Sequence, residues 1–163
     1  MIPWESAVTY NLVTGTHISG DVSDTWYEDA NHIYDYEASG SPGFVADYTF
    51  ENIPYDDSTS YLHLHWTYSY DGNPAHRIIA QVWNYDTLGW DAVTGDLDDF
   101  NNTGGADNKH IFNIGPGLNL PSIAPYVSGG QMIWRQDHVS PGNINHIVGA
   151  EWLHLEEGYE PSS

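Results

Sequence analysis

The chain has 163 residues, no cysteine, and 23 acidic against three basic side chains, which gives a formal charge of −20. This length suits one domain with a substantial buried core. The lack of cysteine excludes disulfides, thiolate zinc sites and cysteine nucleophiles. The negative charge argues against nucleic acid and anionic membranes as partners, because both would be repelled. An aromatic content of 14% argues against disorder.

The first segment, 1–16, carries neither a basic region nor an apolar run, so we expect no secretory signal. No window of the sequence reaches the ~20 apolar residues of a membrane span. Ile2, Trp4, Val8 and Tyr10 are spaced along this segment as apolar anchors. Two interpretations are open: an arm that adds a strand to a neighbouring protein through these four residues, or an ordinary first strand of the domain.

Short runs rich in Tyr, Trp, Val, Ile and Thr recur between turn residues, and helical periodicity is nearly absent. The pattern predicts nine strands, at 7–14, 31–37, 43–51, 61–70, 76–85, 90–94, 109–114, 131–138 and 145–155. In 61–70, the residues from Leu62 to Tyr70 alternate between an apolar face for the core and a face for solvent. We therefore expect an all-β domain over 17–157, an antiparallel, jelly-roll-like β-sandwich, followed by a loose tail at 158–163.

A Gly-Asn-x-x-His turn occurs twice, as GNPAH at 72–76 and as GNINH at 142–146. Each copy follows a tryptophan-containing strand and precedes an apolar strand. The pattern predicts that both turns close β-hairpins, with Gly and Asn at positive φ and the histidine bonded to the turn backbone. A catalytic pair of His76 and His146 is disfavoured, because neither turn offers a serine or cysteine nucleophile.

Two groups of side chains are candidate metal ligands. His63 and His65 lie two apart on one strand face, a spacing that suits zinc or copper, with solvated or interface histidines as the alternative. An acidic segment offers the oxygen ligands that a structural Ca²⁺ prefers, from Asp96, Asp98, Asp99 and Asp107. This segment lacks the spacing of an EF-hand, so a solvated loop is the alternative and we assign no cofactor.

The tryptophans divide into two predicted groups. Those inside strand patterns are expected in the core, namely Trp66, Trp83, Trp134 and Trp152. The others are candidate exposed platforms for sugars, namely Trp4, Trp26 and Trp90. Arg77 and Arg135 are expected to be structural ion-pair partners. No pair of carboxylates stands out as the acid and base of a glycosidase, so we predict that the protein is not an enzyme.

The segments YDGNPAH, QVWNYDTLGWDAVTGDL, YVSGGQMIWRQDH and SPGNINHIVGAEWLHL lie between residues 68 and 155. They resemble β-sandwich modules that recur in tailed-phage virion proteins, both capsid decoration proteins and tail proteins. The shared positions are turn and core residues, namely Gly72, Asn73, His76, Trp83, Asn84, Tyr85, Trp90, Asp91, Gly129, Gly130, Gly142, Asn143 and His146. The resemblance implies a non-enzymatic structural protein and carries over no catalytic residue.

The resemblance and the acidic charge together favour a capsid decoration or cement protein, located on the outer surface of a phage head. Its expected partner is the major capsid protein. We expect a homotrimer at three-fold positions, where three linked weak contacts gain avidity. The alternative is a carbohydrate-binding or receptor-binding tail module with a glycan as its ligand, which exposed aromatic side chains beside Asn and Asp would favour.

Overall fold

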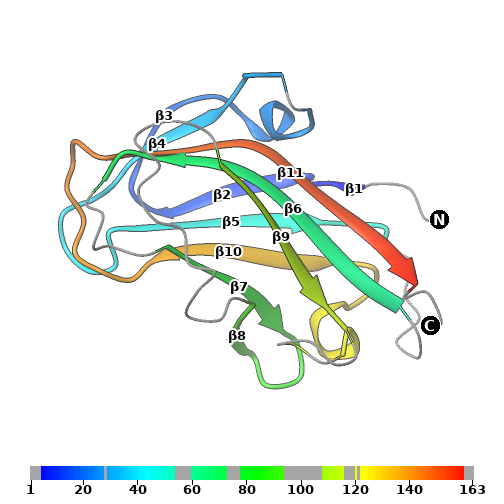
Figure 1. The fold of residues 1–163 in the computed structure, drawn as a ribbon. Helices are drawn as coiled ribbons and strands as arrows, with labels where there is room; N and C mark the ends of the chain where they lie inside the picture. Colours follow the sequence, from blue (N-terminus) through cyan, green and yellow to red (C-terminus); the bar gives the residue numbers. More distant parts are fainter. Residues whose placement is uncertain are drawn as a thin grey trace.

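The computed structural model describes residues 5–27, 29–53, 60–72, 78–93, 108–115, 120 and 122–159. In this part of the chain, eleven strands form two antiparallel sheets that pack face to face (Figure 1). The strands are β1 (Glu5–Ser6), β2 (Thr9–Thr14), β3 (Thr16–Ser19), β4 (Ile33–Tyr36), β5 (Phe44–Phe50), β6 (Ser60–Tyr70), β7 (Ile78–Asn84), β8 (Gly89–Ala92), β9 (Asn108–Ile114), β10 (Met132–His138) and β11 (Ile147–Tyr159).

Sheet A has the strand order β3-β4-β11-β6-β9, with β1 also paired to β11, and sheet B has the order β2-β5-β10-β7-β8. The chain passes repeatedly from one sheet to the other, which confirms the predicted jelly-roll-like sandwich. Two short 3-10 helices, η1 (Val22–Thr25) and η2 (Ala124–Tyr126), complete the described elements. Among the described residues, no helix has the length and apolar character needed to cross a membrane.

The core lies between the sheets and follows the two-residue period of the strands. In β10, the even-numbered residues from Met132 to His138 are buried, whereas the odd-numbered residues between them face outward. The buried face of β6 is equally regular and carries Trp66, which meets Trp134 of β10 edge-to-face with ring centroids 4.7 Å apart. These contacts confirm the core positions predicted for Trp66 and Trp134.

The second face of β6 is less exposed than predicted. Thr67 and Ser69 should face solvent by alternation, yet they are 1% and 5% exposed. Strand β6 is central in sheet A, between β11 and β9, and next to Ser69 the glycine at position 149 lets the Tyr34 ring of β4 approach. Alternation shows which residues share a face, but it does not show whether that face is covered.

The two Gly-Asn-x-x-His segments do not close hairpins, so this prediction is wrong. Strand β6 lies in sheet A and β7 in sheet B, while β10 lies in sheet B and β11 in sheet A, so both connections cross between sheets. Gly142 does not have a positive φ. A Cβ atom on Gly142 would lie 2.2 Å from the Ala38 carbonyl oxygen and 2.7 Å from Gly43 Cα, so glycine is required by close backbone approach. Residues 73–77 of the other copy lie outside the described residues.

Each of the nine predicted strands corresponds to an observed strand, with differences at the ends. Two observed strands were not predicted: β1 has only two residues, and the four residues of β3 are all exposed and show no alternation. Strand β11 continues to Tyr159 and so includes two residues, Gly158 and Tyr159, that the sequence placed in the tail. From Glu5 to Thr14 the N-terminal segment pairs with strands of both sheets.

Candidate functional site

The outer face of sheet B places aromatic and polar side chains side by side. The strand register sets Trp83 of β7 opposite Trp90 of β8. It also sets Arg135 of β10 between Asp47 of β5 and Gln81 of β7. All five side chains are half-buried, so each has part of its surface open to a ligand. We call these five residues the tryptophan face.

Arg135 contacts two other residues of the tryptophan face, Asp47 and Trp90. Its Nε and Nη2 atoms donate hydrogen bonds to the two carboxylate oxygens of Asp47, at 2.7 and 2.9 Å. Its guanidinium carbon lies 4.0 Å from the centroid of the Trp90 ring, within the range of a cation–π contact. This confirms the ion-pair role predicted for Arg135. The bidentate pair neutralises the arginine locally and fixes it against the indole.

The β7–β8 hairpin holds the two indoles in place. Trp83 and Trp90 pack edge-to-face with ring centroids 5.2 Å apart. Beneath them, the Asn84 side-chain oxygen accepts hydrogen bonds from two backbone N–H groups of the following turn, while its amide nitrogen donates to Asp91 at 2.9 Å. The Tyr126 hydroxyl donates to the same carboxylate, and burial together with this bond raises the pKa of Tyr126 to about 12. These hydrogen bonds fix the backbone of the β7–β8 hairpin, which carries both indoles.

A surface of this kind suits an amphipathic ring. Indole faces offer a large apolar contact area, while the Gln81 amide and the Arg135–Asp47 pair offer donors and acceptors at its side. A pyranose ring has C–H groups on its faces and hydroxyls at its edge, so it matches both parts. Asp47 and Gln81 could not be identified from the sequence, because the cross-strand register that places them beside Arg135 cannot be obtained from alternation alone.

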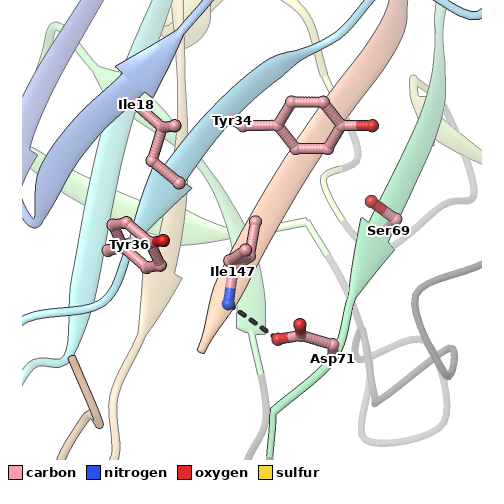
Figure 2. A pocket seen from close by; sticks show the side chains of 6 residues that line it. All are labelled: Ile18, Tyr34, Tyr36, Ser69, Asp71 and Ile147. Carbon is pink, nitrogen blue, oxygen red and sulfur yellow. Dashed lines mark hydrogen bonds between the residues drawn. The ribbon is translucent and has the colours of Figure 1, made fainter. Parts of the chain in front are cut away.

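The outer face of sheet A has a separate hollow of about 260 Å³ (Figure 2). Its lining comes from β3, β4, β6, β11 and the residue after β6, namely Ile18, Tyr34, Tyr36, Ser69, Asp71 and Ile147. Figure 2 shows the Tyr34 ring lying over β11 with its hydroxyl toward the β6 side. We call this hollow the tyrosine pocket.

Two local features of the backbone shape the tyrosine pocket. A register shift in the β3–β4 pairing leaves Ile18 as an extra residue between two paired positions, and bulges of this kind re-aim side chains. Gly149 lies under the pocket, because a Cβ atom there would lie 2.4 Å from Ser69 Oγ and 2.9 Å from Tyr34 Cε1. The missing side chain at Gly149 therefore lets Tyr34 and Ser69 approach each other across β11.

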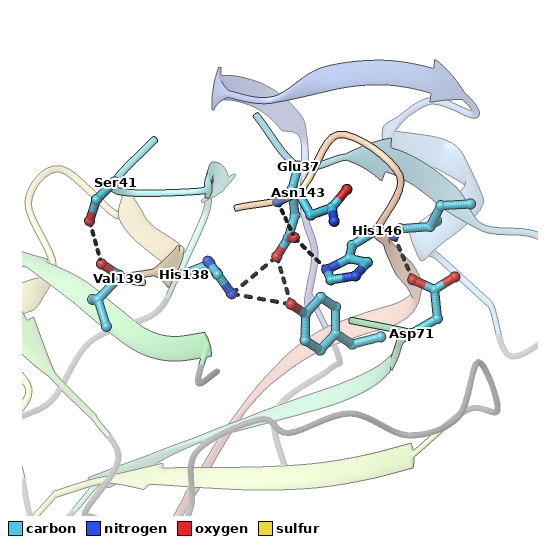
Figure 3. Close-up of polar contacts among 9 residues, drawn as sticks. Glu37, Ser41, Asp71, His138, Val139, Asn143 and His146 are labelled. Carbon is cyan, nitrogen blue, oxygen red and sulfur yellow. Dashed lines mark hydrogen bonds and ion pairs between the residues drawn. The ribbon is translucent and has the colours of Figure 1, made fainter. Parts of the chain in front are cut away.

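A third group of polar residues surrounds Glu37 inside the sandwich (Figure 3). Glu37 Oε1 accepts a hydrogen bond from the Tyr70 hydroxyl at 2.7 Å and lies 3.0 Å from His138 Nε2. Its Oε2 accepts from the Asn143 backbone N–H at 3.0 Å and lies 3.0 Å from His146 Nδ1. The side chains of Glu37 and His138 are fully buried and that of His146 is 25% exposed, so the cluster joins strand ends and its carboxylate lies away from solvent.

Tryptophan positions differ from the prediction in two of the four strands. Trp83 and Trp152 were expected in the core, but both are half-buried on outer faces, Trp83 on sheet B and Trp152 on sheet A beside His65 and His154. In β7, Ala80 and Val82 face the core, so Trp83 faces outward, and in β11 a register shift between Ala150 and Trp152 turns Trp152 to the outer face. Of the predicted platforms, Trp90 lies on the tryptophan face, Trp26 is exposed elsewhere, and Trp4 is outside the described residues.

The four predicted N-terminal contact residues are only partly described. Ile2 and Trp4 lie outside the described residues, and Val8 is 41% exposed. Tyr10 packs against the core, and its hydroxyl donates to Asp35 Oδ2 at 2.5 Å. Burial raises the pKa of Asp35, and burial with this contact raises the pKa of Tyr10 well above its usual range. Their role in binding a partner stays a prediction.

The candidate Ca²⁺ ligands Asp96, Asp98, Asp99 and Asp107, together with Arg77 and His76, lie outside the described residues. His63 and His65 are on the outer face of β6, as alternation predicts, and His65 is opposite His154 of β11. Within the described ranges, no group of three or more His, Asp or Glu residues is arranged to hold a metal ion. The Ca²⁺ site therefore stays a prediction.

No protein-family model and no curated protein matches this sequence. Several solved structures with a similar fold are carbohydrate-binding modules. A xylan-binding domain of family 22 from Paenibacillus barcinonensis has a TM-score of 0.52 and 6% identity, over 97% of this chain and 87% of its own. A family 35 module from Clostridium thermocellum has a TM-score of 0.51 and 11% identity, over 95% and 97%. The xylan-binding module of family 15 has a TM-score of 0.51 and 11% identity, over 97% and 92%.

These similarities support the β-sandwich fold. At such low identity they show the fold alone, because one fold carries many functions. The expected resemblance to phage virion modules, the trimer, the capsid partner and the location on a phage head stay predictions.

Proposed function

We propose that this protein binds carbohydrate without transforming it, and that the tryptophan face is its binding surface. The observation that carries the proposal is the Trp83–Trp90 pair, held beside the Arg135–Asp47 ion pair on the outer face of a sheet. Aromatic platforms with a few fixed polar groups are the usual composition of a small-molecule site. The fold that the chain shares with carbohydrate-binding modules supports the same function.

The negative charge of the molecule favours a neutral glycan over an anionic one as the ligand. A net charge of −20 repels polyanionic polysaccharides, and Arg135 on this face is already paired with Asp47. The ligand we propose is therefore a neutral polysaccharide chain that lies across the indoles. This function corresponds to the alternative drawn from the sequence, a carbohydrate-binding or receptor-binding module, and not to capsid decoration.

Calorimetric titration with soluble neutral polysaccharides tests the proposal. Xylan is included because two of the structurally similar modules are described as xylan-binding. We expect binding to at least one neutral polysaccharide, and none to polygalacturonate, which is polyanionic. Replacing Trp90 with Ala should weaken binding at least about tenfold, as is usual when an aromatic anchor is removed.

The matched control is Tyr27→Ala, which removes an aromatic ring that is 67% exposed and outside the tryptophan face. This variant should bind as the unmodified protein does. The proposal fails if no neutral polysaccharide binds, or if the Trp90→Ala protein keeps its affinity while near-ultraviolet circular dichroism shows an intact fold.

A further inference from the structure

We infer that the tyrosine pocket is a second ligand site, which takes a single amino sugar with its protonated amine at Asp71. The inference rests on the pocket's own chemistry and does not depend on glycan binding at the tryptophan face. The two sites lie on the outer faces of opposite sheets, because the pocket strands belong to sheet A and the tryptophan strands to sheet B.

The size of the pocket suits one ring. Its volume of about 260 Å³ lies just below the ~300–1,000 Å³ of sites for drug-sized ligands. Ser69 is only 5% exposed and lies at the floor, whereas Ile18 at 40% and Tyr36 at 36% stand at the rim. A ring that enters between them would contact apolar surface at the sides and a hydroxyl group below.

The polar groups of the pocket suit a hydroxylated ring. The Ser69 hydroxyl and the hydroxyls of Tyr34 and Tyr36 both donate and accept hydrogen bonds. The faces of the two tyrosines and the side chains of Ile18 and Ile147 provide contacts for C–H groups. This mixture of apolar walls and hydroxyl groups is better matched by a sugar than by a purely apolar molecule.

The charge at the pocket selects a cation. Asp71 is solvent-exposed, and its Oδ1 accepts a hydrogen bond from the Ile147 backbone N–H at 2.7 Å, which fixes the carboxylate at the pocket edge (Figure 2). Nothing in the six-residue lining is basic. The net charge of −20 further favours a cation, and tyrosine faces attract one. A protonated amine on the sugar is such a cation, and it can donate a hydrogen bond to the Asp71 carboxylate.

The test compares three sugars that differ at one ring position: glucosamine, N-acetylglucosamine and glucose. They are titrated into isotopically labelled full-length protein at about pH 6, where an amine is protonated. We expect glucosamine to shift the backbone amide signals of Asp71, Tyr36 and Ile147 and to leave the Trp83 and Trp90 indole signals in place. The two neutral sugars should bind at least about tenfold more weakly.

Two variants locate the interaction. Asp71→Asn keeps an oxygen that can accept from the Ile147 N–H but removes the charge, so it should weaken glucosamine binding about tenfold. Tyr36→Leu removes an exposed ring and tests the site separately if the first variant is unstable. Trp90→Ala should leave glucosamine binding unchanged, which separates this site from the tryptophan face.

The inference is overturned if glucose binds as tightly as glucosamine at these amides, because the pocket would then not select a cation. It is equally overturned if no amide of the pocket responds to glucosamine, or if both pocket variants bind it with unchanged affinity. A protein that binds neutral polysaccharide but fails this test would leave the proposed function standing.

Discussion

Trp83 and Trp134 lie in adjacent strands of sheet B but cover opposite sides of it. Trp134 is 0% exposed and contacts Trp66 and Tyr48 between the sheets. Trp83 is half-buried on the outer face and contacts Trp90. The same residue type therefore stabilises the core in one strand and offers a ligand surface in the next.

Replacing each tryptophan with Ala should separate these roles. We expect Trp134→Ala to lower the free energy of unfolding by ~3–5 kcal/mol, because it leaves a large cavity. Trp83→Ala should cost only ~1–2 kcal/mol, because part of the ring is already in solvent. Urea denaturation followed by circular dichroism measures both values. Equal losses in the two variants would contradict the assignment of Trp83 to the outer face.

At the scale of elements, Glu37 connects segments that are distant in the sequence. Its carboxylate accepts hydrogen bonds from Tyr70 at the end of β6 and from the Asn143 backbone in the connection before β11. It also lies within 3.0 Å of His138 at the end of β10 and of His146. One buried acid thus fixes the point where two connections cross between the sheets (Figure 3).

Removing this carboxylate should be costly. We expect Glu37→Ala to reduce the free energy of unfolding by ~3–5 kcal/mol, because it removes the buried acceptor that Tyr70, His138, His146 and the Asn143 backbone share. Glu51→Ala is the control, since Glu51 is exposed and its loss should change stability by no more than ~0.5 kcal/mol. Chemical denaturation of both variants gives the comparison. A loss below ~1 kcal/mol for Glu37→Ala would show that the Glu37 cluster contributes little to the stability of the fold.

The strands themselves could be predicted from the sequence, because the two-residue period of runs such as 132–138 is set by burial of one face. Their arrangement could not, because sheet order depends on long-range pairing that no local pattern records. For this reason the sequence placed Trp83 in the core and treated the Gly142 segment as a hairpin turn. The tyrosine pocket was missed as well, since it joins Ile18 of β3, Tyr34 of β4 and Asp71, the residue after β6.

At the scale of the whole molecule, a charge of −20 coexists with acids inside the fold. Asp35, Glu37 and Glu151 are all buried, and each carboxylate accepts at least one hydrogen bond. Burying a charge is costly unless it is paired or hydrogen-bonded, so these acids are placed where donors converge. The acids that remain on the surface produce a negative electrostatic potential, which acts at both proposed sites.

The pairing of β1 with β11 has a kinetic consequence. Glu5 lies opposite Leu155, so residues 150 positions apart (155 − 5 = 150) are neighbours in sheet A. Contacts at such separation form only after most of the intervening chain is ordered, because closing a long loop costs entropy before any contact compensates it. We expect refolding to take roughly milliseconds to seconds, as for other β-sandwiches, when it is followed by tryptophan fluorescence after rapid dilution from urea. Complete recovery in well under a millisecond would mean that the folding of local segments, and not the pairing of β1 with β11, determines the refolding rate.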